Sequence, residues 1–299
     1  MRHSIHIILN PVAGARRPGL LHVVVERLRR AGAEVVVEET SGPGDATLLA
    51  QRVAMRGEAD VVVAAGGDGT INEVARGLLG YSIPLGIIPL GTANVLALEL
   101  GLRAHAGDVA DMLLSGPAHL IGTGLVEGHI FLMMVGIGFD GVVVHRINPR
   151  LKRLWGKGAF VWAGFKEWVR GPGRDIRLIA DGREKRAAWV IALNGRYFAG
   201  PYVLARGGDI SLPGLTLFLF RNGSRFAFLR YLIALGLGRV ERLADVEVLP
   251  VRHVRIVSPD GLEVEVDGDA RGALPQVIEQ GTRILRLVVP AGARMGPKI

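Results

Sequence analysis

Three short polar motifs share an arrangement that suits phosphate chemistry. They are Asn10–Gly14, Gly66–Thr70 and Pro89–Asn94, and each follows a short apolar run and precedes a helical pattern. Glycine at the end of a strand lets backbone N–H groups approach phosphate oxygens, and the first turn of the next helix adds partial positive charge. Phosphate binding is therefore the chemistry that these motifs predict.

The second motif, Gly66-Gly67-Asp68-Gly69-Thr70, places a carboxylate among the glycines. Asp68 would repel a bare polyphosphate, so at a nucleotide its role would be to hold Mg²⁺ or its water shell. The alternative is a tight turn in which Asp68 caps a helix. Both interpretations stay open at this point.

The first and third motifs are weaker when each is taken alone. Arg16 and Arg17 follow Gly14 and can meet phosphate oxygens, but an ordinary strand-to-helix turn has the same pattern. Thr92 and Asn94 offer side chains to phosphate or ribose, but Thr92 can equally cap a helix. Neither motif identifies a function by itself.

A fourth motif, Val264–Asp269, is an alternating strand that ends in two carboxylates around Gly268. Asp269 could accept a hydroxyl proton during phosphoryl transfer, whereas solvated acids at turns are the common alternative.

The order of apolar runs predicts the elements that position these motifs. Up to Ser115, strand-like runs alternate with amphipathic stretches, which indicates an α/β domain with a doubly wound, mostly parallel sheet. Ligands of such sheets lie beyond the carboxyl ends of the strands. The expected strands are 5–9, 34–38, 60–65 and 85–88, and the expected helices are 20–31, 46–56, 71–79, 93–100 and 108–115.

After Gly116 the pattern changes to frequent strand-like runs, which predict a β-rich domain with helical insertions at 142–170 and 225–239. We expect a nucleotide-binding domain at 1–116, a β-rich substrate domain at 117–291 and a loose tail at 292–299. The expected strands of the second domain are 130–135, 174–180, 189–193, 215–220, 246–249, 254–257, 262–266 and 284–289.

Composition narrows the function classes. The chain has 299 residues, 49% of them hydrophobic, which excludes wholesale disorder. It contains no Cys, so disulfides, thiolate zinc sites, iron–sulfur clusters and a Cys nucleophile are excluded. The net charge of +8, carried mostly by Arg, should attract anions. The first lysine is Lys152, so the amino-terminal half holds no lysine-dependent phosphate loop.

Together, the four motifs resemble the diacylglycerol kinase catalytic-domain family, which includes bacterial lipid kinases and is related to sphingosine and ceramide kinases. The resemblance spans Asn10 to Asp269 and depends on the combination, because Gly-Gly-Asp-Gly-Thr alone also occurs in NAD kinases. It implies an ATP-dependent lipid kinase that phosphorylates a hydroxyl of a diacylglycerol-like, sphingoid-like or ceramide-like lipid. The implied cofactors are ATP and Mg²⁺, and the implied pathway is phospholipid biosynthesis.

The resemblance also assigns residues. The family's proton acceptor, usually Glu, falls on Asp269, while Asp68 takes a catalytic and metal-binding role and Asp267 shapes the turn. The family's ATP contacts fall on Asn10, Pro11, Val12, Ala13, Gly14, Thr40, Gly66, Gly67, Asp68, Gly69, Thr70, Ile71, Asn72 and Thr92.

The sequence departs from the family pattern in two places. Val95 stands where many bacterial members have an Asp that helps to organise Mg²⁺. The stretch 207–214 keeps one acid, so we expect the family's structural Mg²⁺ site to be absent. The string Gly136–Gly141 matches a dinucleotide fingerprint formally, but no acid follows at the spacing that binds ribose, so we interpret it as a hinge.

The insertion around 151–170 predicts membrane contact. It interleaves three of the four Trp residues with Lys and Arg, which suits an anionic lipid interface, and 225–239 has the same character. An amphipathic helix facing a core is the alternative. With no signal-peptide core and no RNA-binding signature, we expect a cytoplasmic, peripherally membrane-associated protein with no nucleic-acid partner.

Two other functions stay open. One is an NAD-kinase-like enzyme with a soluble substrate, for which no second signature is found. The other is a catalytically weak lipid-binding regulator, suggested by Val95 and by the thinned acidic loop. Neither the acceptor lipid nor the oligomeric state follows from a motif.

Overall fold

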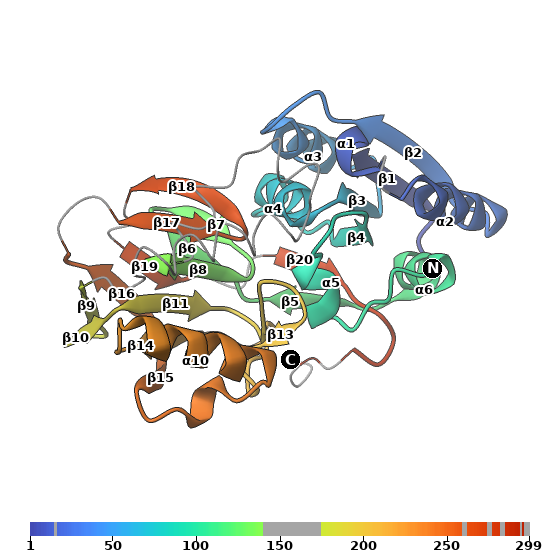
Figure 1. The fold of residues 1–299 in the computed structure, drawn as a ribbon. Helices are drawn as coiled ribbons and strands as arrows, with labels where there is room; N and C mark the ends of the chain where they lie inside the picture. Colours follow the sequence, from blue (N-terminus) through green and yellow to red (C-terminus); the bar gives the residue numbers. More distant parts are fainter. Residues whose placement is uncertain are drawn as a thin grey trace. The chain divides into compact units, whose positions relative to one another are not determined.

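A mostly parallel sheet organises the amino-terminal part of the chain (Figure 1). The computed structural model describes residues 1–14, 17–139, 175–258, 262–273, 277–281, 285–293 and 295. The parallel strands β1 to β4 lie in the order β2-β1-β3-β4. They are β1 (Ser4–Leu9), β2 (Glu34–Glu39), β3 (Val61–Gly66) and β4 (Leu85–Pro89). Strands β3 and β4 are buried at every position, as expected for parallel strands covered on both faces.

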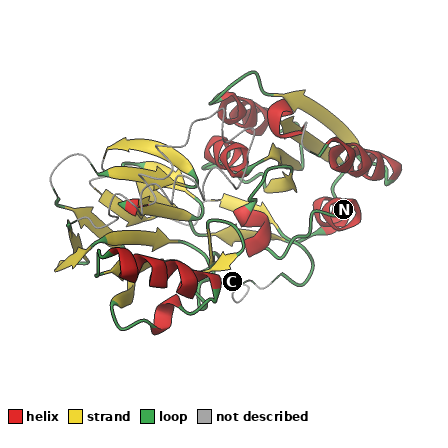
Figure 2. Cartoon of the chain, in the orientation of Figure 1, coloured by secondary structure: helices red, strands yellow, loops and turns green. Residues whose placement is uncertain are grey.

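Helices cover both faces of this sheet, as Figures 1 and 2 show. Helices α3 (Asp45–Arg56) and α4 (Asp68–Gly77) pack together on one face, and α2 (Pro18–Arg30) and α6 (Ala106–Ser115) pack on the other. Gly77 allows α3 and α4 to approach closely, because a Cβ there would lie 2.3 Å from the carbonyl oxygen of Thr47. The predicted α/β domain with a mostly parallel sheet is confirmed.

Two more strands complete the sheet from later parts of the chain. β20 (Leu285–Val288) lies parallel to β4, with Leu287 opposite Leu85, and β5 (Ala118–Ile121) pairs with β20 in the antiparallel sense. The first compact unit therefore holds Met1–Gly122, Ile210–Leu212 and Thr282–Ile299, and the second holds Thr123–Asp209 and Pro213–Gly281. These bounds differ from the expected boundary at 116, because an apolar run identifies a strand but not the sheet that it joins.

The second unit is built from two antiparallel sheets, with orders β10-β9-β16-β19-β6-β7 and β15-β14-β11-β8-β17-β18. Their facing sides form one core that includes Phe131, Ile137, Leu217, Val254 and Val264. This confirms the predicted β-rich domain. Its strands are β6 (Gly124–Val126), β7 (His129–Phe131), β8 (Met134–Ile137), β9 (Ile176–Ala180), β10 (Arg183–Ala187), β11 (Trp189–Leu193), β14 (Leu215–Phe220), β15 (Val246–Val251), β16 (His253–Ile256), β17 (Glu263–Val266), β18 (Asp269–Ala273) and β19 (Val277–Gln280), with the small pair β12 (Tyr197–Phe198) and β13 (Tyr202–Val203).

Helix α10 (Arg225–Gly236) packs on the other face of the sheet that contains β11 and β14. The ring of Trp189 lies 4.2 Å from that of Phe220 and 5.1 Å from that of Phe228, and Tyr231 packs edge-on against Phe220. A short 3₁₀ helix, η1 (Val240–Arg242), follows. The helix expected at 225–239 is therefore present and ends three residues earlier.

Two expected segments lie outside the described residues: the insertion at 142–170 and most of the tail at 292–299. Across the ranges that the structure does describe, none of the helices combines the length and the apolar character needed to cross a membrane.

Candidate active site

The residues predicted to contact ATP lie at the ends of β1 to β4 and in the segments that follow them, including α1 and the first turns of α4, where Thr70, Ile71 and Asn72 are buried. These strands are parallel, so the four loops lie at one edge of the sheet. The short helix α1 (Pro11–Gly14) follows β1, while α4 follows β3 and α5 (Val95–Glu99) follows the loop after β4. The sheet thus brings three of the sequence motifs to the same edge.

Asn10 ties the first loop to the second. Its side-chain amide donates a hydrogen bond to Thr70 Oγ1 at 3.1 Å, and its Oδ1 accepts from the backbone N–H groups of Val12 and Ala13. The backbone N–H of Asn10 also donates to the carbonyl oxygen of Ala65, at the end of β3. Asn10 therefore fixes the shape of its own loop and its position beside the second motif.

The second and third motifs touch through their glycines. A Cβ on Gly91 would lie 2.5 Å from Gly67 Cα and 2.8 Å from Asn94 Oδ1. Asn94 closes its loop on itself, since its Oδ1 accepts from Gly91 N and its Nδ2 donates to Gly91 O. Asn94 is buried, whereas Thr92 is exposed.

Gly91→Ala is expected to destabilise the protein by about 1–3 kcal/mol, because the new methyl group forces two backbone segments apart. The free energy of unfolding in urea measures this. Gly19→Ala is the matched control, because its Cβ would meet no atom within 4 Å and it lies in helix α2. Equal stability of the two variants would contradict the close approach of the two loops.

Asp68 joins the second motif to the third in a way that the sequence did not predict. It is the first residue of α4, yet its Oδ1 accepts from the backbone N–H of Val95, at 2.7 Å, at the start of α5. Burial raises the pKa of Asp68, while hydrogen bonds from the N–H groups of Val95, Leu96 and Asn94 oppose that rise. The carboxylate therefore caps the neighbouring helix α5 and also accepts the backbone N–H of Asp68 itself, at the start of α4.

Glu73 of α4, three residues after the second motif, holds another loop of this edge. Its Oε1 accepts from the backbone N–H of Gly44 at 3.0 Å, and its carbonyl oxygen accepts from Thr47 Oγ1. This fixes the turn between β2 and α3, where Thr40 donates its N–H to Leu9 O. Sequence reasoning missed this role of Glu73.

These residues fit ATP better than a directly bound metal ion. The first turn of α4, which begins after Gly67, offers backbone N–H groups, which suit phosphate oxygens. Among the described residues no group of three or more His, Asp or Glu could hold a metal ion. Since an oxygen of Asp68 already accepts an amide N–H, direct coordination of Mg²⁺ by Asp68 stays a prediction.

In the second unit, the predicted proton acceptor follows a tight hairpin turn. Asp267 and Gly268 have φ values of 49° and 89°, and Val266 pairs with Asp269, the first residue of β18. Two residues of positive φ are typical of a type I′ turn. The Asp269 side chain is exposed at the end of this rigid hairpin.

Asp267 clamps this turn to a neighbouring one. Its carboxylate accepts from the backbone N–H groups of Leu132, Met133 and Met134 at 2.7, 2.8 and 2.9 Å. Asn194 donates to Leu132 O as well. These contacts interrupt the extended strand between β7 and β8, so the expectation of one strand at 130–135 is wrong. The apolar run there carries no local turn residue, and the break depends on partners far along the sequence.

Asp267→Ala is expected to cost about 3 kcal/mol of stability, because three partly buried N–H groups lose their acceptor at once. Urea unfolding measures the loss, and Asp267→Asn should recover part of it by keeping one side-chain oxygen. Glu184→Ala, at an exposed position of β10, is the control and should change stability by less than about 0.5 kcal/mol. A loss for Asp267→Ala no larger than this would mean that the clamp is not needed.

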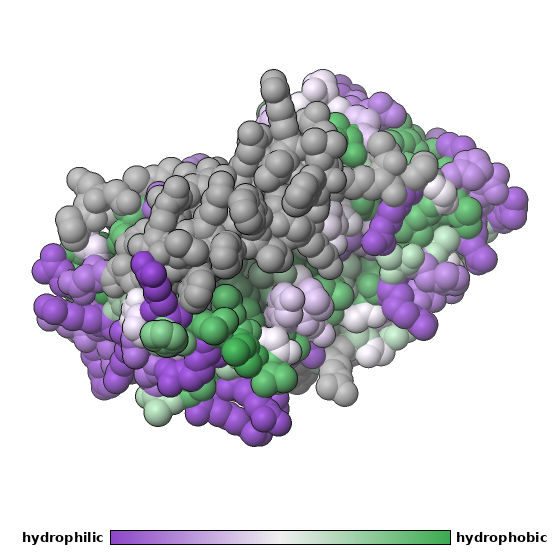
Figure 3. All heavy atoms as spheres, viewed as in Figure 1, coloured by the Kyte–Doolittle hydropathy of each residue, from purple (hydrophilic) through white to green (hydrophobic). Residues whose placement is uncertain are grey.

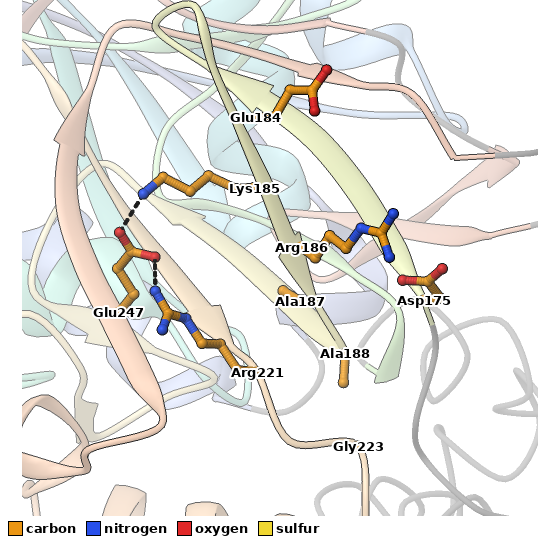
Figure 4. Close-up of a pocket in the computed structure, with 9 residues that line it drawn as sticks. All are labelled: Asp175, Glu184, Lys185, Arg186, Ala187, Ala188, Arg221, Gly223 and Glu247. Atoms are coloured by element: carbon orange, nitrogen blue, oxygen red, sulfur yellow. Dashed lines mark hydrogen bonds and ion pairs between the residues drawn. The ribbon is translucent and has the colours of Figure 1, made fainter.

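A charged hollow of about 550 Å³ also lies in the second unit (Figure 4). At one side Glu247 of β15 accepts from Lys185 of β10 at 2.6 Å and from Arg221 at 2.7 Å. These hydrogen bonds lower the pKa of Glu247. The residues that line the hollow include three cations and three acids but none of the predicted site residues. We therefore assign these charged residues the role of joining the edge strands β10 and β15.

Comparison with known proteins agrees with the geometry. The family model for the diacylglycerol kinase catalytic domain matches residues 4–126, and that for the YegS C-terminal NAD kinase beta sandwich-like domain matches residues 133–289. A diacylglycerol kinase of Bacillus subtilis (strain 168) is 29% identical over 294 residues, 95% of each chain. A probable YegS-like lipid kinase of Chromohalobacter salexigens is 31% identical, over 82% of this chain and 80% of that protein.

The fold is also found among solved structures. A putative diacylglycerol kinase from Bacillus anthracis str. Sterne superimposes with a TM-score of 0.81, covering 98% of this chain and 97% of the other at 24% identity. With both family domains matched in order along the chain, this protein belongs to the family of diacylglycerol kinases and related lipid kinases, and it is a lipid kinase.

Proposed function

We propose that this kinase transfers the γ-phosphoryl group of ATP to a hydroxyl of a membrane lipid, either diacylglycerol-like or of the sphingoid or ceramide type. The observation that carries this proposal is the set of glycine-rich loops held together at one sheet edge, in the part of the chain that the catalytic-domain model matches. Such loops suit the phosphates of a nucleotide. A role in phospholipid biosynthesis follows from the same proposal.

In the proposed reaction, backbone N–H groups of the loops and of the first turn of α4 bind the phosphate oxygens. Asp269 takes the proton of the lipid hydroxyl while the hydroxyl oxygen bonds to the γ-phosphorus of ATP. The bond between the γ-phosphorus and the β-phosphate oxygen breaks, which leaves ADP. Mg²⁺ bound with ATP would supply positive charge at the phosphates. Asp68 would keep the second and third loops in place for this step.

The proposed substrate also implies a location. A lipid hydroxyl is presented at a membrane surface, so we propose that the kinase works peripherally on the cytoplasmic face, where anionic lipids attract its net charge of +8. The Trp-rich segment 151–170, which supports this proposal in the sequence, lies outside the described residues.

Phosphate transfer from labelled ATP tests the function. The purified protein is incubated with Mg²⁺ and with detergent micelles of diacylglycerol, ceramide or sphingosine, and with NAD as a soluble acceptor. We expect label in one of the lipids. Label in NAD instead would support the NAD-kinase-like alternative, and vesicle binding without any transfer would support a regulatory lipid-binding role.

A further inference from the structure

Helix α10 exposes a row of large apolar side chains along one side, which we call the α10 stripe. It consists of Phe226, Leu229 and Ile233 and of Leu237, the residue directly after the helix, which are 84, 45, 56 and 61% exposed. Spacings of three and four residues place these side chains on one face of a helix. Figure 3 shows hydrophobic atoms gathered on the surface at the position of α10, beside hydrophilic ones. The inward face of the helix consists of Ala227, Phe228, Tyr231, Ala234 and Leu235.

The helix packs on the sheet through the side opposite the stripe. Ser224 caps the helix by accepting from Ala227 N, and Phe228 and Tyr231 pack on Phe220 and Trp189. These contacts anchor α10 through its opposite side. A helix that is buried on one side and exposes a second apolar face leaves that face for a partner.

Arginines flank the stripe and indicate the chemistry of that partner. Arg225 and Arg230 lie on either side of it at 100° per residue, and Arg239 follows its carboxyl end; all three are exposed. Arg230 also forms an ion pair with Asp245, which holds its position. An apolar row with cations along its borders is the pattern of a helix that lies in a lipid interface, with rings and aliphatic groups below the headgroups.

We propose that the α10 stripe and its flanking arginines dock on the surface of a lipid bilayer that contains anionic lipids. The inference rests on the proposed function, in which the substrate resides in a membrane. A second copy of this chain fits the face less well, because it would bring its own arginines and net charge of +8 against the same cations. Anionic headgroups complement these cations, and lipid chains accept the apolar side chains.

This surface predicts binding with two components. The arginine contribution weakens as ionic strength rises, because salt screens exposed charges beyond about 10 Å at 0.1 M. The apolar contribution does not depend on salt. Vesicle binding of the wild type should therefore fall at high salt without vanishing.

The absence of native Cys provides a direct test, because one introduced Cys is a unique labelling position. Ile233→Cys and Leu48→Cys would each carry an environment-sensitive fluorophore. Leu48 is the matched control, since it is 65% exposed on helix α3. With vesicles of equal parts phosphatidylglycerol and phosphatidylcholine, we expect a blue shift at residue 233 and none at residue 48. No shift at residue 233 while the protein is bound to vesicles overturns the proposal.

A double substitution tests the energetic role of the stripe. Phe226→Ser with Ile233→Ser should lower partitioning onto the same vesicles at least about 10-fold, and most strongly at high salt. Leu48→Ser with Met55→Ser, at equally exposed positions of α3, should leave it unchanged. Thermal melting of each variant confirms that it is folded, and the labelling experiment stays decisive if a variant is not.

The readouts separate this inference from the proposed function. Loss of vesicle binding by the stripe variant supports docking even if the wild type phosphorylates no lipid, in which case only the proposed function fails. If the wild type sediments as a dimer and the stripe variant as a monomer with unchanged vesicle binding, the stripe is an interface between copies and the proposal is wrong.

Discussion

Asp269→Asn is expected to lower the rate of phosphate transfer to lipid by about 10²–10⁴-fold, because the amide keeps the size of the side chain but cannot accept the hydroxyl proton. Asp269→Glu is expected to remain active, since it keeps the carboxylate and matches the family's commoner residue. Transfer from labelled ATP to lipid at saturating substrate measures kcat for each variant.

The position of Asp269 makes this result interpretable. The residue is exposed at the start of β18, and the turn before it is fixed by Asp267 rather than by Asp269 itself. Melting temperatures of the Asn and Glu variants should therefore equal that of the wild type. Glu184→Gln, another exposed acid of the second unit, serves as the activity control. Wild-type kcat for Asp269→Asn would place the proton acceptor elsewhere.

Two substitutions of Asp68 are expected to separate the effect of its negative charge from the effect of its hydrogen bond to Val95. Asp68→Ala should abolish turnover and also cost about 1 kcal/mol of stability, because Val95 N–H loses the oxygen that caps α5. Asp68→Asn keeps an oxygen for that N–H, so it should unfold like the wild type at acidic pH, where the Asp68 carboxyl is also uncharged. If the negative charge serves the nucleotide and its Mg²⁺, Asp68→Asn should still lose turnover by about 100-fold or more.

The pH dependence of stability gives a second readout for Asp68. Burial raises its folded-state pKa above the ordinary value of 3.8, so ionisation is less favourable in the folded chain than in the unfolded one. The Asp68 carboxyl therefore makes its full contribution to stability below pH 3.8, and this contribution is lost as pH rises through the raised pKa. As pH rises through the raised pKa, the melting temperature of Asp68→Asn should therefore increase relative to that of the wild type. Near-normal turnover of a folded Asp68→Asn would leave the residue a helix cap only.

Much of the first sheet could be predicted because its signals are local. The runs at 5–9, 34–38, 60–65 and 85–88 match β1 to β4 within a residue or two, since continuous apolar runs separated by amphipathic stretches leave few other arrangements. The same reasoning placed three motifs at the carboxyl ends of strands.

The features that the sequence did not predict depend on contacts between residues far apart in the chain. The turn between β7 and β8 exists because Asp267, far along the chain, accepts three N–H groups there. The bond from Val95 to Asp68 likewise joins two motifs that a sequence pattern treats separately. Sequence reasoning found these acids as chemical groups, but their structural partners follow only from the tertiary fold.

The place of β20 in the first sheet sets an order for folding during synthesis. Strand β20 lies between β4 and β5, so until residues 285–288 leave the ribosome both of those strands lack a neighbour on that side. The first sheet therefore closes only after the second unit has been made, although most of its strands come before that unit. A nascent chain carries an open strand edge throughout translation of the second unit, and only a chain that includes β20 holds the loop after β4 in a complete sheet.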